Sequence, residues 1–84
     1  MKVQAEISIY PLRIQSLSEP IEEFCGILRD YDLETTVNAM STIIAGESAE
    51  LFKACEKTFE QLTPKYQIIM NIKISNACPL DGPN

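Results

Sequence analysis

Two segments of the chain alternate apolar and polar residues with a period of two. In residues 2–10 the odd positions are apolar, and the even positions are Lys2, Gln4, Glu6, Ser8 and Tyr10. Residues 66–74 alternate in the same way, and one side of that segment carries Gln67, Ile69, Asn71 and Lys73. Because successive side chains of a strand point to opposite faces, each segment predicts a β-strand with one buried face.

Two other segments repeat apolar residues at the i, i+3, i+4, i+7 spacing of a half-buried helix. The first follows Ser18 or Glu19 as a cap, with Pro20 in its first turn, and its apolar stripe is Ile21, Phe24, Cys25 and Leu28. The second begins at Ser48 as a cap and ends before Pro64. Its predicted apolar face is Leu51, Phe52, Cys55, Phe59 and Leu62.

Residues 33–38 and 42–45 are rich in β-formers, and the four residues between them, Asn38 to Ser41, are short enough for a hairpin connection. We expect Pro11 to end the first strand, since proline cannot donate to a ladder, and Gly46 to end the third. The predicted order is therefore βαββαβ. Right-handed crossovers place both helices on the same face of one four-stranded antiparallel sheet, which is the ferredoxin-like α+β fold. Residues 1–75 form a single domain and 76–84 a C-terminal tail.

One face of such a sheet is left uncovered by helices, and polar side chains gather on it. Three interpretations stay open: a solvated face, a face buried in a homo-oligomer, or a small-molecule site in which a few polar groups converge. For a site, the candidate residues are an aromatic platform, an acid, two hydroxyls and two amides. They are Tyr10, Glu6, Ser8, Thr42, Asn38 and Asn71. An acid and an aromatic ring suit a cationic heterocycle.

Composition excludes several classes of function. The net charge of −5 argues against a nucleic-acid partner, and no apolar run approaches the roughly 20 residues that span a bilayer. The N-terminal segment lacks a signal-peptide core, so we expect a cytoplasmic protein.

Three widely spaced cysteines without any histidine predict neither a disulfide framework nor a metal site, and no cofactor is expected. Arg13 stands in the first βα loop without a phosphate-binding glycine pattern, and no nucleophile has an evident base. We therefore expect no enzyme.

Three short segments resemble the small thiamine-binding proteins related to YkoF. They are "AEISIYPL" at 5–12, "MSTIIAGE" at 40–47 and "IIMNIKI" at 68–74. The family pattern in the second segment is Thr, two β-formers, Glu, Gly and an acid. This chain follows it except at Ala45, which replaces the Glu.

The resemblance implies a ferredoxin-like protomer that forms a homodimer or homotetramer and binds thiamine, or its hydroxymethylpyrimidine part, without turnover. It implies a site near the sheet and the subunit interface, at the positions that match the motifs: Tyr10, Ser41, Thr42 and Glu47. Such a protein is a carrier or a sensor. Two alternatives of other classes remain, a structural oligomerising module and a regulatory domain that binds an amino acid.

Overall fold

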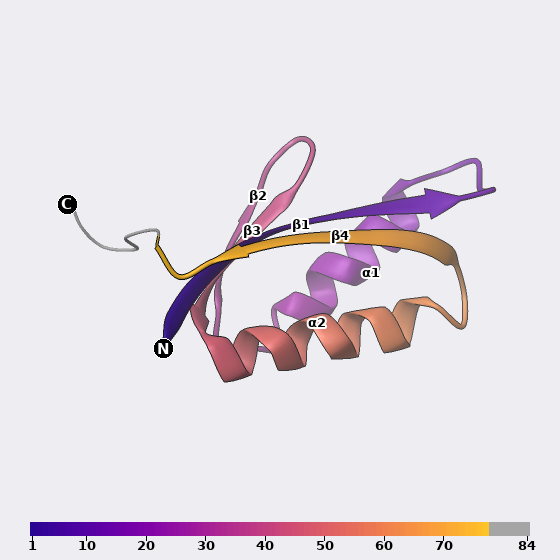
Figure 1. The fold of residues 1–84 in the computed structure, drawn as a ribbon. Coiled ribbons are helices and arrows are strands. Elements are labelled where there is room, and N and C mark those ends of the chain that lie inside the picture. Colours follow the sequence, from indigo (N-terminus) through magenta and orange to yellow (C-terminus); the bar gives the residue numbers. More distant parts are fainter. Residues whose placement is uncertain (78–84) are drawn as a thin grey trace.

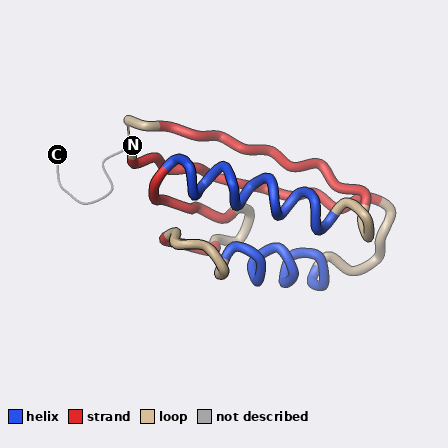
Figure 2. Tube along the Cα trace, turned by 90° about the horizontal axis from the view of Figure 1, so that it is seen from below, coloured by secondary structure: helices blue, strands red, loops and turns tan. Residues whose placement is uncertain are grey.

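Residues 1–77 are described by a computed structural model, in which the six predicted elements appear in the predicted order. The elements are β1 (Lys2–Leu12), α1 (Ser18–Leu28), β2 (Glu34–Val37), β3 (Thr42–Glu47), α2 (Ser48–Leu62) and β4 (Gln67–Ser75). The strands form one antiparallel sheet in the order β2-β3-β1-β4, and both helices pack against one face of it (Figures 1 and 2). The ferredoxin-like fold is confirmed.

The core lies between the sheet and the two helices, and the odd-numbered residues of β1 supply its centre. Val3, Ala5, Ile7 and Ile9 are all buried, as the alternation predicts. The helices contribute their apolar stripes, which include the buried and free Cys25 and Cys55. Burial raises the pKa of the Cys55 thiol, so this cysteine serves as a small apolar residue. Cys78 and most of the predicted tail lie outside the described residues.

The prediction that Pro11 ends the first strand is wrong. β1 continues to Leu12, and Pro11 pairs with Ile68 of β4. A proline is tolerated in a strand where its nitrogen faces a side without a partner strand. That condition holds at Pro11, because the pairing of β1 with β3 stops at Ile7.

The prediction that Gly46 ends the third strand is also wrong, since Gly46 lies inside β3 and pairs with Val3. The glycine is there because the chain before β2 crosses close to it. A Cβ atom at position 46 would lie 2.8 Å from Leu33 Cδ2 and 3.3 Å from the Asp32 carbonyl oxygen. Gly46 therefore allows a close approach of backbone and side chain.

The helices differ from the sequence-based expectation in their caps and in the width of one apolar face. Neither helix has a side-chain cap, because α1 has Leu17 and α2 has Glu47 at the N-cap position. The predicted apolar face of α2 is too wide: Phe52 and Phe59 are 58% and 45% exposed. The face that meets the core is narrower and includes Ala54 and Thr58, both fully buried.

We predict that Gly46→Ala destabilises the fold by roughly 1–3 kcal/mol, because the added methyl group overlaps Leu33 in a packed region. Urea unfolding followed by circular dichroism measures the change. In a Leu33→Ala background the same substitution should cost much less. An equal penalty in the two backgrounds would show that the contact with Leu33 is not the cause.

Candidate functional site

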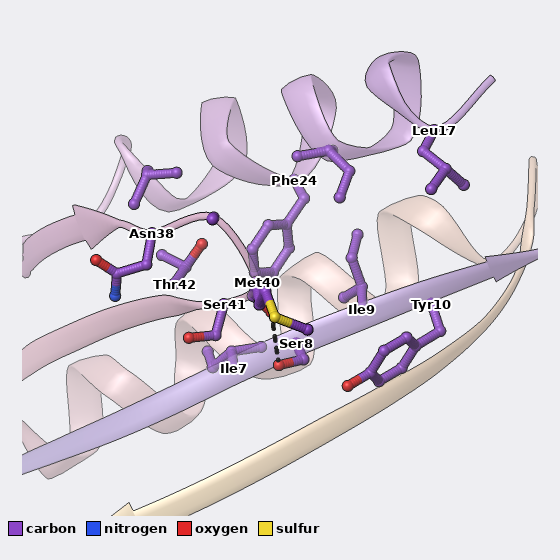
Figure 3. Close-up of a pocket in the computed structure, with 13 residues that line it drawn as sticks. Ile7, Ser8, Ile9, Tyr10, Leu17, Phe24, Asn38, Met40, Ser41 and Thr42 are labelled. Atoms are coloured by element: carbon purple, nitrogen blue, oxygen red, sulfur yellow. Dashed lines mark hydrogen bonds between the residues drawn. The ribbon is translucent and has the colours of Figure 1, made fainter.

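A pocket of about 300 Å³ lies at one end of the sheet, between β1, α1 and the β2–β3 hairpin (Figure 3). Its volume is at the lower end of the range for small-molecule sites. Four consecutive residues of β1, from Ile7 to Tyr10, form one wall. Side chains from the start of α1 and its approach form the second, and residues 37–42 of the hairpin form the third. The lining from the α1 side is Leu17, Ile21 and Phe24.

The pocket exists because β3 is shorter than β1. Pairing between the two strands ends at Ile7 and Thr42, whereas pairing between β1 and β4 continues to Leu12 and Gln67. Within residues 1–77, the side of β1 beyond Ile7 therefore has no neighbouring strand. In Figure 3 the hairpin turns away at this point and α1 lies above the space.

Three hydrogen bonds organise the hairpin around the pocket. The Asn38 N–H donates to the Ser41 carbonyl oxygen at 2.8 Å and closes the turn. The Ser8 hydroxyl donates to the Met40 carbonyl oxygen at 3.4 Å, drawn as a dashed line in Figure 3, and connects the turn to β1. The Ser41 hydroxyl donates to Glu6 Oε2 at 2.8 Å. Because both serine protons are used in this way, each oxygen keeps lone pairs that can accept from a ligand.

The structure brings five of the eight sequence-predicted site residues together. Ser8, Tyr10, Asn38, Ser41 and Thr42 all line the pocket. Their exposure differs, since Tyr10 is half exposed and Thr42 is buried on the helix-facing side of the sheet.

The remaining three predicted residues, all acids or amides, lie elsewhere. Glu6 is next to the pocket through its bond with Ser41, and it lines a shallower hollow of about 220 Å³ on the open face, with its cross-strand neighbour Lys73. Asn71 is opposite Ser8 on β4 but does not line the pocket. Glu47 is at the far end of β3, opposite Lys2.

Glu47 has a different partner, the N-terminal ammonium group of Met1, at 2.9 Å. The hydrogen bond and the positive charge of this ammonium hold the pKa of the Glu47 carboxyl below its ordinary value. A second exposed ion pair joins Lys65 and Glu23 at 2.7 Å, and it raises the pKa of Lys65. Both pairs are outside the pocket lining.

Sequence reasoning missed the apolar part of the pocket. Ile21 and Phe24 belong to a helix stripe that reads as core, and Phe24 is indeed 2% exposed. Leu17 and Met40 have no periodic neighbours, and they are 54% and 88% exposed. Both are large apolar residues in predicted loops, and that position was the available signal.

Among residues 1–77, the pocket lining contains no Asp, Glu, Lys, Arg or Cys, and the phenol of Tyr10 is its one titratable group. In this described part of the chain, no three Cys, Asp or Glu side chains come close enough together to hold a metal ion. Within the same residues, neither helix has the length and hydropathy needed to cross a membrane.

The fold and the pocket define a small ferredoxin-like protein with a largely apolar, ligand-sized cavity at the edge of its central strand. A family model described as "Thiamine-binding protein" matches residues 5–77. The chain belongs to this thiamine-binding protein family.

Relatives of this chain have the same fold. UPF0045 protein MJ1052 from Methanocaldococcus jannaschii is 32% identical over 75 residues, which are 87% of this chain and 75% of that protein. The crystal structure of MJ1052 matches 95% of this chain and 84% of that one, with a TM-score of 0.85 and 28% identity. A structure from Thermotoga maritima, described as a thiamine biosynthesis or salvage protein, also matches. The match covers 88% of this chain and 82% of the Thermotoga chain. Its TM-score is 0.81 and its identity 18%, so this likeness concerns the fold alone.

We predict that the Glu47 carboxyl titrates below the ordinary glutamate range because of its bond to the Met1 ammonium. Since its pKa is lower in the folded state, its contribution to stability is present above the unfolded pKa. That contribution is lost as the pH falls through the folded pKa. A carbon-detected NMR titration measures this midpoint. After acetylation of the amine the pKa should rise toward the ordinary value, and an unchanged midpoint would contradict the assignment.

Proposed function

We propose that this protein binds thiamine or its hydroxymethylpyrimidine moiety in the pocket between β1, α1 and the hairpin, without turnover, as a carrier or sensor. The observation that carries the proposal is the convergence in one cavity of Tyr10 and the polar residues Ser8, Asn38, Ser41 and Thr42. The family to which the chain belongs supports the same ligand class.

The neutral lining favours the pyrimidine half of the ligand inside the pocket. A thiazolium cation buried there would have no carboxylate beside it, and an uncompensated charge in an apolar site is costly. The aminopyrimidine ring is neutral and planar, so it can stack against Tyr10 and fill the apolar space below Phe24. Asn38 supplies both a donor and an acceptor at the hairpin side.

Glu6 suits the other half of the ligand. Glu6 does not line the pocket, but it accepts a 2.8 Å hydrogen bond from the hydroxyl of Ser41, which does. Its side chain is exposed on the open face of the sheet. A thiazolium ring that extends from the pocket toward this carboxylate would have its charge balanced in a solvated position. Asn71, opposite Ser8, is within the same open face.

The same lining supports binding rather than catalysis. General acid–base chemistry needs a positioned proton donor or acceptor, and among residues 1–77 the phenol of Tyr10 is the one ionisable side chain in the pocket lining. The hydroxyls of Ser8 and Ser41 donate to a carbonyl and to a carboxylate, and neither has a base to activate it as a nucleophile. A cytoplasmic location stays a prediction from the sequence.

We predict that the wild-type protein binds thiamine or hydroxymethylpyrimidine with one site per protomer, and that Tyr10→Ala weakens this binding by roughly 10-fold or more. Loss of stacking on a heterocycle costs about 1–3 kcal/mol, and each 1.4 kcal/mol is a factor of ten. Isothermal titration calorimetry measures the affinity. A melting-temperature shift with ligand provides the second readout, because a ligand of the folded state stabilises it by mass action.

The matched control is Ile69→Ala. Ile69 is the cross-strand partner of Tyr10, has a similar exposure of 54%, and does not line the pocket. This variant should keep the wild-type affinity. Equal losses in both variants would mean that the sheet end, rather than stacking, is disturbed. No heat and no melting shift with either compound would refute the proposed function.

Self-association is part of the proposal, and the exposed apolar side chains at the β4 edge support it. β4 is an edge strand, and Ile72 and Ile74 on its helix-facing side remain 40% and 39% exposed. Phe52 and Phe59 on α2 are also exposed. Large apolar side chains left uncovered in a chain of 84 residues favour burial between protomers.

We predict a homodimer or homotetramer in sedimentation-velocity experiments, and a shift toward monomer in the double variant Phe59→Lys/Ile74→Lys. Charges at these positions should be tolerated in the monomer because both side chains are partly exposed there. The control Glu60→Lys reverses the charge at an exposed site beside Phe59 and should leave the assembly unchanged. A monomeric wild-type protein would refute the self-association.

A further inference from the structure

Beyond Ile7, the side of β1 that β3 no longer pairs has backbone N–H and C=O groups as well as the space of the pocket. We call it the vacant side of β1. From Gln4 to Leu12 the strand is paired with β4, but on the β3 side its pairing covers only Lys2 to Ile7. In the part of the chain that the structure describes, the residues that follow Ile7 on β1 have no strand beside them on this side. The hydrogen-bond pattern of the sheet shows which residues of β1 point their N–H and C=O groups toward this unpaired side.

Two backbone hydrogen bonds fix that pattern independently. The Ser48 N–H donates to the Met1 carbonyl oxygen at 2.9 Å, so odd-numbered residues at the start of this ladder face β3. At the hairpin, the Asn38 N–H donates to the Ser41 carbonyl oxygen, so the next residue, Thr42, turns its groups away from β2 and toward its partner Ile7. In an antiparallel sheet the direction alternates residue by residue. Both bonds therefore give the same result: odd residues of β1 face the β3 side and even residues face β4.

Two odd residues, Ile9 and Pro11, fall on the vacant stretch. Ile9 presents an N–H and a C=O to it, whereas Pro11 presents a carbonyl group alone because proline has no N–H. In residues 1–77, no backbone hydrogen bond from a turn or loop reaches Ile9 or Pro11. Ile9 thus supplies the one complete backbone donor–acceptor pair on the vacant stretch of β1.

The pocket is wrapped around this edge. It is lined by Ile7 and Ile9, whose side chains point to the helix layer, and also by Ser8 and Tyr10, whose side chains point to the open face. A cavity on one face of a strand would be lined by every second residue of that strand. This pocket is lined by four consecutive residues of β1, from Ile7 to Tyr10. Figure 3 shows Tyr10 below the ribbon of β1 and Phe24 above it. The edge of the strand, with the peptide groups of Ile9, is therefore part of the pocket wall.

A small planar molecule suits this edge better than another strand. An added strand needs a continuous row of donors and acceptors, and Pro11 removes the second donor from the row. The hairpin turn also closes the near end, where the Ser8 hydroxyl meets the Met40 carbonyl oxygen. The remaining opening offers one donor and one acceptor side by side.

We infer that the main chain of Ile9 recognises the ligand: its N–H donates to a ring nitrogen and its C=O accepts from an adjacent exocyclic amino group. The ligand class is a flat heterocycle with neighbouring acceptor and donor atoms, of which a 4-aminopyrimidine is the example offered by the proposed function. The inference rests on that proposed function and adds the atoms that read the ring.

The test replaces the Ile9 amide by an ester, which removes the N–H and keeps the side chain. Cys25 allows ligation of a synthetic 1–24 segment to the rest of the chain, so the full-length protein can be made. Calorimetry with hydroxymethylpyrimidine should show an affinity roughly 3- to 10-fold lower than for the ligated wild-type chain, the range of one hydrogen bond.

The matched control is the same ester at Val3. Val3 is another buried, β-branched residue of β1 with the same direction, but its N–H faces Gly46 in the ladder and it does not line the pocket. This control should unfold at a lower temperature and keep its affinity. The Ile9 ester should show the opposite combination, since its N–H has no strand partner to lose.

Amide hydrogen exchange gives a second readout on the unmodified protein. Without ligand, the Ile9 amide should exchange faster than those of Ile7 and Tyr10, and hydroxymethylpyrimidine should slow it. If wild type binds neither thiamine nor the pyrimidine, the proposed function fails and this inference fails with it. If wild type binds but the Ile9 ester keeps full affinity and the amide gains no protection, this inference alone is overturned.

Discussion

The structure depends on the unequal pairing of its central strand. β1 is held by β4 along almost its whole length but by β3 along only its first half. The shared half carries the core, because the buried residues Val3, Ala5 and Ile7 lie there on the face of the sheet that the helices cover. The unshared half is kept in extended form by β4 alone. Because β1 extends beyond β3, it has an unpaired edge, which α1 covers and the hairpin borders. The pocket forms at this edge.

Hydrophobic periodicity along the chain was enough to predict the fold and five of the residues that line the pocket. A period of two assigns Ser8 and Tyr10 to the open face, and the short hairpin brings Asn38, Ser41 and Thr42 to the same end of the sheet. The motif resemblance grouped Glu47 with Thr42, but five positions of extended strand separate them, so the two residues lie at opposite ends of β3. The sequence could not reveal that Phe24 faces a cavity, since a core stripe and a pocket wall have the same periodicity.

The mistaken expectations have a common physical origin. Pro11 and Gly46 are strand breakers by propensity, yet both lie within strands because of what is beside them. At Pro11 the neighbouring strand is absent, so a missing N–H costs no bond. At Gly46 the neighbouring chain is unusually close, so a missing side chain is required. Local rules predict what a residue disfavours, and tertiary neighbours decide whether that matters.

The polar groups of the pocket also discriminate between ligand classes. The hydroxyl protons of Ser8 and Ser41 are donated to a carbonyl and a carboxylate, so both oxygens act toward a ligand as acceptors. An amino acid would bring a carboxylate, whose charge a cation would have to balance, and in the described part of the chain the pocket lining has no Lys or Arg. Arg13, near the end of β1, is already bonded to Gln67. An acceptor-rich, uncharged site therefore favours a neutral ring that carries an amino group, and it disfavours the amino-acid ligand of a regulatory domain.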